Sequence, residues 1–202
     1  MTKIVHLRIR IRGDWTRVEQ QGRQDAWTMF RTFKERIPEF KDAYFFQSGP
    51  VAGARETRRI VGDYVLTEED IWATKRHEDV VVLGAGRLDR HAPTAQPHHV
   101  EHVVAPYDIS YRTLLPQKVE NLLVAGRCHS ATSEALASSR LTATAMGMGQ
   151  AAGVAAALAA QSSATTRDVP IGTLQDVLRR QHAILERPVP VAEPVPSTAA
   201  AR

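Results

Sequence analysis

The chain has 202 residues, of which 43% are apolar and 24% charged, a balance typical of folded globular proteins. Lys and Arg exceed Asp and Glu by 26 − 22 = +4, and residues 1–41 hold ten of the basic residues against five acidic ones. Because these basic residues form no dense block and aromatic residues make up only 6% of the chain, we expect no nucleic-acid binding.

The single cysteine, Cys128, excludes an intrachain disulfide and an iron–sulfur cluster held by this chain alone. It fits a reducing compartment, and with an N-terminus that lacks a signal-peptide pattern it predicts a cytoplasmic protein. Residues 141–160 carry no charge but consist mostly of Ala and Gly without flanking aromatic residues. We therefore expect a buried helix there and no membrane span.

The first half of the chain predicts alternating strands and helices. Residues 3–12 alternate apolar and basic side chains, as in a half-buried strand. Trp27, Phe30 and Phe33 recur at helical spacing within a predicted helix over 21–37, which Pro38 ends. A short aromatic strand is expected at 43–47 and another strand around 60–61. Thr67 then predicts a helix start with a capping box.

The second half predicts a buried strand at 80–83, a loop over 84–99 and a strand at 100–105. The apolar run 121–125, closed by Gly126, is typical of a strand buried on both faces. Helices are expected over 141–160 and 172–184, followed by a disordered Pro- and Ala-rich tail over 187–202.

The segment from 121 to 160 carries the clearest chemical signal. A buried strand ends in Gly126 and Arg127, a polar loop of small residues follows, and a long helix begins after it. Ligands of α/β proteins bind beyond the carboxyl ends of strands, and the free N–H groups of a helix N-terminus favour negative charge. This order of elements predicts a site for an anionic or dinucleotide ligand.

Motifs along the chain, in order, resemble those of one family. In the closing segment they comprise residues 121–128, 130–132, 134–135, 138, 140 and 149–157; upstream they comprise Glu19 with 22–27, 55–64, 66–70, Asp89 with His91, and 111–112 with 114–116. Over about residues 5–185 the chain is similar to FAD-dependent oxidoreductases with a glutathione-reductase-type flavin domain, grouped with heterodisulfide reductase A-subunit-like flavoproteins.

The resemblance implies roles for individual residues. Those assigned to FAD binding are Gly126, Arg127, Thr132, Glu134, Gly147, Gly149 and Gln150. The catalytic candidates are Arg58 and His91, on the substrate side, and Arg140, which opens an uncharged helix where an anionic ligand would bind. Gly149 and Gly153, four residues apart, are expected to let this helix pack closely on the sheet.

Some of these residues have plainer explanations. Arg58 can pair with a neighbouring carboxylate, Cys128 can be a small buried apolar residue, and His91 can belong to a flexible loop. The histidines His98, His99 and His102 suggest metal only weakly, so no metal is predicted.

The chain also departs from the family. It lacks the GxGxxG turn that cradles the FAD pyrophosphate; Gly84-Ala85-Gly86 follows a predicted strand but has no third glycine. Ser133 stands where the family often has a histidine, and Leu141-Thr142 stand where Met-Pro is common. The sequence therefore predicts the C-terminal part of a flavoprotein without its dinucleotide-binding half.

These inferences lead to a mixed α/β fragment. Residues 1–104 are expected to form a cap or substrate domain, 105–186 the returning portion of an FAD-binding domain, and 187–202 a disordered tail. The predicted function is a contribution to an FAD-dependent oxidoreductase acting on a small molecule, with FAD bound weakly or not at all by this chain alone. A second polypeptide carrying the N-terminal half is the expected partner, and oligomers are possible. The alternative is a non-catalytic remnant or interaction module.

Overall fold

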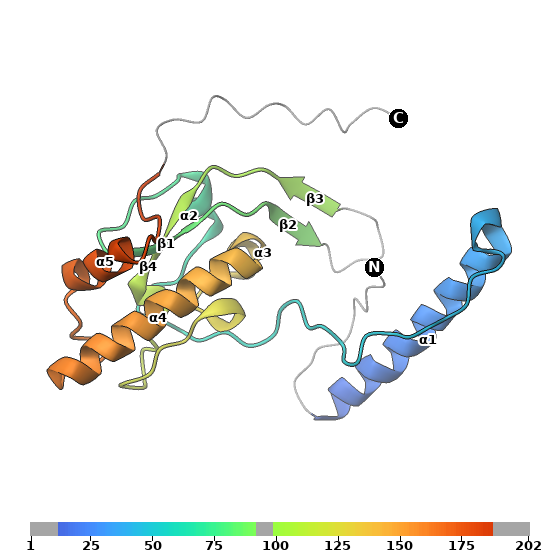
Figure 1. The fold of residues 1–202 in the computed structure, drawn as a ribbon, viewed down its shortest axis with the longest axis horizontal. Coiled ribbons are helices and arrows are strands. Elements are labelled where there is room, and N and C mark those ends of the chain that lie inside the picture. The colour runs from blue at the N-terminus through green and yellow to red at the C-terminus, as the bar shows by residue number, and fades with distance from the viewer. Residues whose placement is uncertain (1–11, 92–98, 188–202) are drawn as a thin grey trace. The chain divides into compact units, whose positions relative to one another are not determined.

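The structure is a computed structural model that describes residues 12–91 and 99–187 (Figure 1). It divides into two compact units, residues 1–57 with 92–97, and residues 58–91 with 98–202. The described residues form five α-helices and two two-stranded antiparallel sheets, so the predicted mixed α/β class is confirmed. Apart from Arg12 and Arg187, the predicted strand at 3–12 and the predicted disordered tail at 187–202 lie outside the described residues. The functional boundary near residue 104 stays a prediction.

The first unit is built on one helix, α1 (Arg12–Arg36), which is longer than expected. Trp15 and Val18 continue the apolar stripe toward the N-terminus, and Asp14 places a negative charge in the first turn, where the helix dipole favours it. Gly13 therefore does not end the element, and the helix begins at Arg12. A short 3-10 helix, η1 (Pro38–Phe40), follows where the proline was expected to end α1.

The predicted aromatic strand at 43–47 is wrong: this segment is extended but forms no strand. Phe45 packs edge-on against Trp27 and Phe30 of α1, with ring centroids 5.6 Å apart in both pairs. Tyr44 and Phe46 on either side are exposed. The side chains alternate in exposure as they would in a strand. However, the segment packs beside a helix, whose backbone groups are not available for the hydrogen bonds of a sheet.

The second unit contains both sheets. Strand β1 (Val80–Gly84) pairs antiparallel with β4 (Tyr107–Ser110), and β2 (Leu88–His91) pairs antiparallel with β3 (His99–His102). The prediction of β1 is confirmed, whereas the expected loop over 84–99 contains β2. Strand β4 was not predicted, because Asp108 and Ser110 break the apolar pattern. Both polar side chains are buried with hydrogen-bonding partners.

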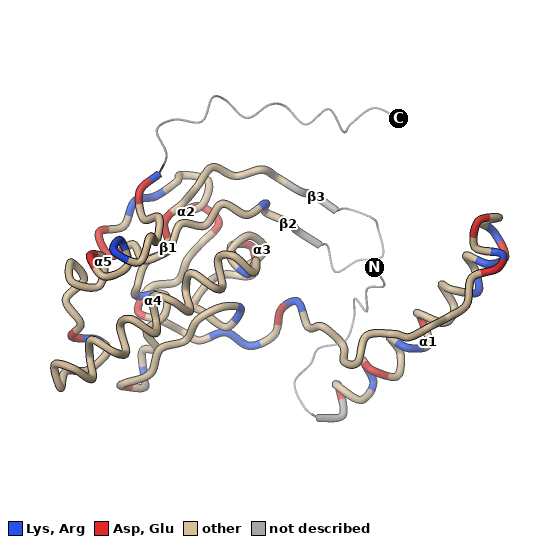
Figure 2. The backbone as a smooth tube through the Cα atoms, viewed as in Figure 1, with Lys and Arg blue, Asp and Glu red and all other residues tan. Residues whose placement is uncertain are grey.

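Helix α4 (Thr142–Ser162) covers β1 and carries no charged residue along its length (Figure 2). Its buried face includes Met148, Ala151 and Ala155, and α5 (Ile171–Arg180) packs beside it. By length and composition α4 could cross a membrane. Because the face of α4 that bears Met148 is buried in the core of this unit, we interpret α4 as a helix that packs one face on the core and leaves the other open.

Two short helices complete the unit. Helix α2 (Glu68–Trp72) begins with the predicted capping box between Thr67 and Asp70. Helix α3 (Ser133–Ser139), which the sequence analysis placed in a loop, begins with Thr132, whose side chain accepts a hydrogen bond from the N–H of Ala135. Its small polar residues are poor indicators of a helix, but five of its seven residues are buried.

Three irregular segments, 60–66, 112–117 and 126–132, are joined by backbone hydrogen bonds. Segment 60–66 bonds to 126–132 through Ile60 N–H to the Cys128 carbonyl (3.0 Å) and Leu66 N–H to the Ser130 carbonyl (3.1 Å). Ser130 N–H in turn donates to the Thr113 carbonyl at 2.9 Å. The strand expected around 60–61 is replaced by isolated bridges at Gly62 and Leu66.

The apolar run 121–125 is not the buried strand that was predicted. The run belongs to no strand, and it begins at Asn121, whose φ of +53° is left-handed. Leu122 is 42% exposed, and residues 123–125 are only partly buried. Val124 N–H donates to the Leu114 carbonyl at 2.9 Å. No strand of residues 12–91 or 99–187 lies beside this run, so its backbone groups find no ladder to join.

Candidate functional site

The end of the extended run meets the start of the long helix at one corner. Gly126 has φ +74°, a left-handed conformation that favours glycine, and opens the 3-10 helix η3 (Gly126–Cys128). A Cβ placed on Gly126 would lie 3.7 Å from the Cβ of Ala145, in the first turns of α4. The turn and the N-terminus of α4 are therefore adjacent. Because residue 126 is a glycine, it places no side chain between them.

The N-terminus of α4 has no side-chain cap. Helices α2 and α3 begin with Thr67 and Thr132, whose hydroxyls accept N–H hydrogen bonds, but Leu141 at the start of α4 offers no such group. The first turn of α4 also holds no acidic residue. The free N–H groups and the positive end of the helix dipole favour an anionic or carbonyl group at this corner.

The loop that leaves the turn is buried. His129 is fully buried, and its Nε2 lies 2.8 Å from the Ser139 hydroxyl oxygen. Burial, reinforced by the charge of Arg59, lowers the pKa of His129 to about 4, so the imidazole is neutral at pH 7. Ser130 is also fully buried, and its hydroxyl accepts a hydrogen bond from Gly62 N–H at 3.0 Å.

Arg140 lies between α3 and α4 and pairs with β2. Its Nη2 lies 3.0 Å from Oδ2 of Asp89, and the arginine side chain is 20% exposed. The arginine places a positive charge at the positive end of α4, which is unfavourable without a counterion. The carboxylate of Asp89 supplies that counterion, so the ion pair joins the α3–α4 junction to the sheet.

The structure places the predicted cofactor residues at different points. Gly126 and Arg127 form the turn at the corner, Thr132 caps α3, and Glu134 is exposed in the first turn of α3. The side-chain amide of Gln150 bonds to Gln181, away from the turn. Their roles toward FAD stay predictions.

The three glycines of α4 have different surroundings. A Cβ on Gly147 would come within 3.0 Å of a Val82 methyl group, so Gly147 packs on β1. A Cβ on Gly149 or Gly153 would meet nothing within 4 Å. The expectation that Gly149 and Gly153 let α4 pack on the sheet is therefore wrong for the described chain, and Gly147 has that role.

The substrate-side candidates are only partly placed. Arg58 is exposed and lies two residues before Ile60, which is hydrogen-bonded to Cys128. His91 ends β2, two residues after Asp89, and its side chain lies outside the described residues. Within the described part of the chain, no three His, Cys, Asp or Glu residues gather where they could hold a metal ion.

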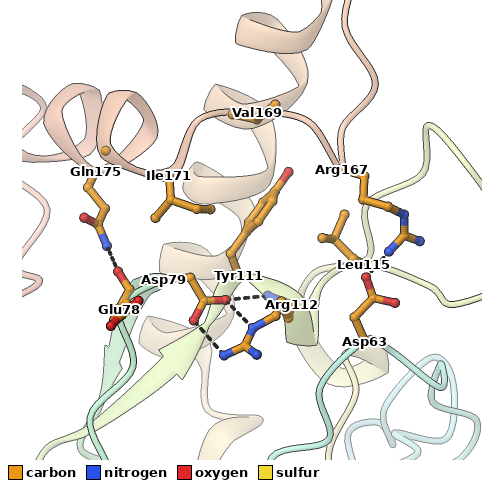
Figure 3. Close-up of a pocket in the computed structure, with 11 residues that line it drawn as sticks. Asp63, Glu78, Asp79, Tyr111, Arg112, Leu115, Arg167, Val169, Ile171 and Gln175 are labelled. Carbon is orange, nitrogen blue, oxygen red and sulfur yellow. Dashed lines mark hydrogen bonds and ion pairs between the residues drawn. The ribbon is translucent and has the colours of Figure 1, made fainter.

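A cavity of about 630 Å³ that the sequence analysis missed lies beside α5 (Figure 3). Asp79 in its wall accepts hydrogen bonds from Arg112 Nε (2.9 Å) and Nη2 (3.2 Å) and from Ser110. Burial raises the pKa of Asp79, but these hydrogen bonds outweigh it and hold the pKa below its usual value. Arg167 on another wall pairs with Asp63. Because both arginines already hold carboxylates, we interpret the pairs as structural.

A family model described as FAD dependent oxidoreductase matches residues 2–178, which is most of the chain and confirms the resemblance to FAD-dependent oxidoreductases. The grouping with heterodisulfide reductase A-subunit-like flavoproteins stays a prediction. Neither the curated proteins nor the solved structures gave a match.

Proposed function

The chain belongs to the family of FAD-dependent oxidoreductases, and we propose that it supplies part of the flavin site and a substrate-facing surface for hydride or electron transfer. FAD is the cofactor of the family. When bound, it supplies the redox chemistry, and the protein supplies orientation and electrostatics. The observation that carries the proposal is the corner at which Gly126 meets the uncapped N-terminus of α4.

The residues of this corner fit a flavin edge. A left-handed glycine leaves the backbone accessible at Gly126, and the free N–H groups of α4 favour the pyrimidine edge of the ring, which becomes anionic on reduction. Arg127 in the same turn adds a positive charge. On the substrate side we place Arg58 and His91, with Arg140 held by Asp89 at the α3–α4 junction.

The described residues do not supply a pyrophosphate cradle. A Cβ on Gly84 would lie 2.4 Å from the Tyr107 ring, and one on Gly86 would lie 2.3 Å from a Leu141 methyl group. These two glycines therefore serve internal packing and leave no room for a phosphate. We propose that the pyrophosphate site comes from a second polypeptide or segment that carries the glycine-rich half.

Two exposed features support such a partner. The apolar run 121–125 belongs to no sheet and is only partly buried, so part of its apolar surface is open to a partner. The outer face of α4 carries Met146, which is 70% exposed, together with Gly149 and Gly153 in open surroundings. A strand followed by a helix would cover both. We place the assembled enzyme in the cytoplasm, in keeping with its single cysteine.

The test is flavin binding by this chain alone and in the presence of a polypeptide that carries the glycine-rich half. Titration of FAD into the purified chain is expected to give weak or no binding. Addition of a polypeptide with the GxGxxG half is expected to yield a yellow complex with bands at about 370 and 450 nm, a property of the flavin itself. Tight, stoichiometric FAD in the isolated chain would contradict the proposed partner. Failure of the mixture to take up FAD would contradict the flavin role and favour a non-catalytic remnant.

A further inference from the structure

The loop over residues 126–132 contains two adjacent polar side chains, His129 and Ser130, that are fully shielded from solvent. Burying a polar group is unfavourable unless it is hydrogen-bonded, so each needs a partner within the protein. The two residues find their partners in different segments: His129 in α3 and Ser130 in segment 60–66.

His129 depends on one side-chain hydrogen bond. Its Nε2 bonds to the Ser139 hydroxyl at 2.8 Å, whereas its Nδ1 is buried without a partner in the described part of the chain. The imidazole is neutral, because burial lowers its pKa to about 4. Removing the hydroxyl of Ser139 would therefore leave a buried ring with no polar contact among the described residues.

Ser130 is fixed by a close approach of the backbone. A Cβ on Gly62 would lie 2.7 Å from the Cβ of Ser130 and 3.0 Å from the carbonyl oxygen of Arg112. Only glycine allows the N–H of residue 62 to reach the Ser130 hydroxyl. This side of the loop is thus held by backbone packing, and the other side by the His129–Ser139 bond.

The end of α3 that bears Ser139 is itself anchored. Arg140, the next residue, is the C-cap of α3 and pairs with Asp89 of β2 at 3.0 Å. We propose that Ser139 and His129 are positioning residues that hold the Gly126–Cys128 turn against the start of α4. The inference rests on the proposed function, because the turn that these residues hold borders the proposed flavin corner.

The test compares two neighbouring serines of α3 in the full chain, without flavin. Ser139→Ala removes the partner of His129. Ser138→Ala is the matched control, because Ser138 is equally buried but bonds to the Tyr107 hydroxyl (2.9 Å) and the Gly86 carbonyl (2.5 Å) instead. Amide hydrogen exchange of Ser130 and Thr132, followed by NMR, reports opening of the loop.

We expect Ser139→Ala to accelerate exchange at Ser130 and Thr132 by about tenfold, the usual scale for one lost buried hydrogen bond. Ser138→Ala is expected to leave these two amides unchanged even where it lowers the melting temperature as much. Ser139→Thr, which keeps the hydroxyl, is expected to restore slow exchange. If Ser139→Ala does not fold, Ser139→Cys, with its weaker hydrogen bond, replaces it and is expected to show a smaller acceleration.

Wild-type exchange in the Ser139 variant, or an equal acceleration in Ser138→Ala, would overturn the inference. Because the measurement needs no cofactor, its outcome is separate from that of the FAD titration. A chain that takes up no FAD but shows the selective acceleration refutes the proposed flavin role and leaves the positioning bond established.

Discussion

Replacing Gly149 or Gly153 with alanine probes the outer face of α4. Both glycines lie inside a 21-residue helix, and a Cβ at either position meets nothing within 4 Å. Alanine is favoured over glycine in a helix interior by about 0.5–1 kcal/mol. Each substitution is therefore expected to raise the free energy of unfolding of the isolated chain by about that amount.

Urea denaturation followed by circular dichroism measures this change, and Gly147→Ala is the matched control. A Cβ at Gly147 would lie 3.0 Å from a Val82 methyl group, so overpacking opposes the gain in helix propensity. We expect Gly147→Ala to be neutral or destabilising.

In the reconstituted complex we expect Gly149→Ala and Gly153→Ala to lose their stability advantage over Gly147→Ala. A partner helix packed on the outer face would clash with the new methyl groups. Destabilisation of the isolated chain by Gly149→Ala would show that this face is already packed, and would refute the reasoning that leads to a partner there.

Other positions give equally direct tests. Gly62→Ala is expected to lower the free energy of unfolding by about 2–3 kcal/mol in urea titrations, because the new Cβ would lie 2.7 Å from that of Ser130; a wild-type midpoint would contradict the close approach. Gly126→Val places a branched residue at φ +74° and is expected to reduce flavin occupancy in the complex, whereas Gly126→Asn retains more; unchanged occupancy in the valine variant would place the site elsewhere. The pKa of His129 falls from 6.5 to about 4 on folding, so its contribution to stability is complete above pH 6.5 and is lost as the pH falls toward 4, by up to about 3 kcal/mol. His129→Gln is expected to flatten this part of the stability–pH curve, and a curve as steep as that of the wild type would assign the effect to other groups.

The sequence predicted best those elements that are marked by a pattern of neighbouring residues, such as a capping box, a buried apolar run or a long uncharged helix. The capping box at Thr67, strand β1 and helix α4 each follow from a pattern that is contained within the element. Strand β4 and helix α3 were missed, since their buried polar residues are stabilised by partners far along the chain. The Ser110 hydroxyl of β4 bonds to Asp79, and the Ser138 hydroxyl of α3 accepts a hydrogen bond from the Tyr107 hydroxyl. Such pairings leave no local periodicity to detect.

The same limit applies to the candidate site. The order of Gly126, the loop and the long helix was readable, because a glycine after an apolar run and before a helix has few structural uses. The ion pair between Arg140 and Asp89 could not be predicted from the sequence, because 51 positions separate the two residues. From the sequence, Arg140 was therefore predicted as a catalytic candidate, a role that stays a prediction, and its internal counterion Asp89 was not foreseen.

The error at residues 121–125 is informative about the partner. An apolar run predicts a strand that is buried on both faces, but the pattern does not say which polypeptide provides the burial. In the described chain this run is partly exposed and pairs with no strand, and the outer face of α4 is apolar, glycine-containing and open. One added unit, a strand beside 121–125 and a helix over Gly149 and Gly153, would satisfy both features. The proposed partner therefore predicts that both features become buried together when the complex forms, and protection of only one of them would contradict a strand–helix unit.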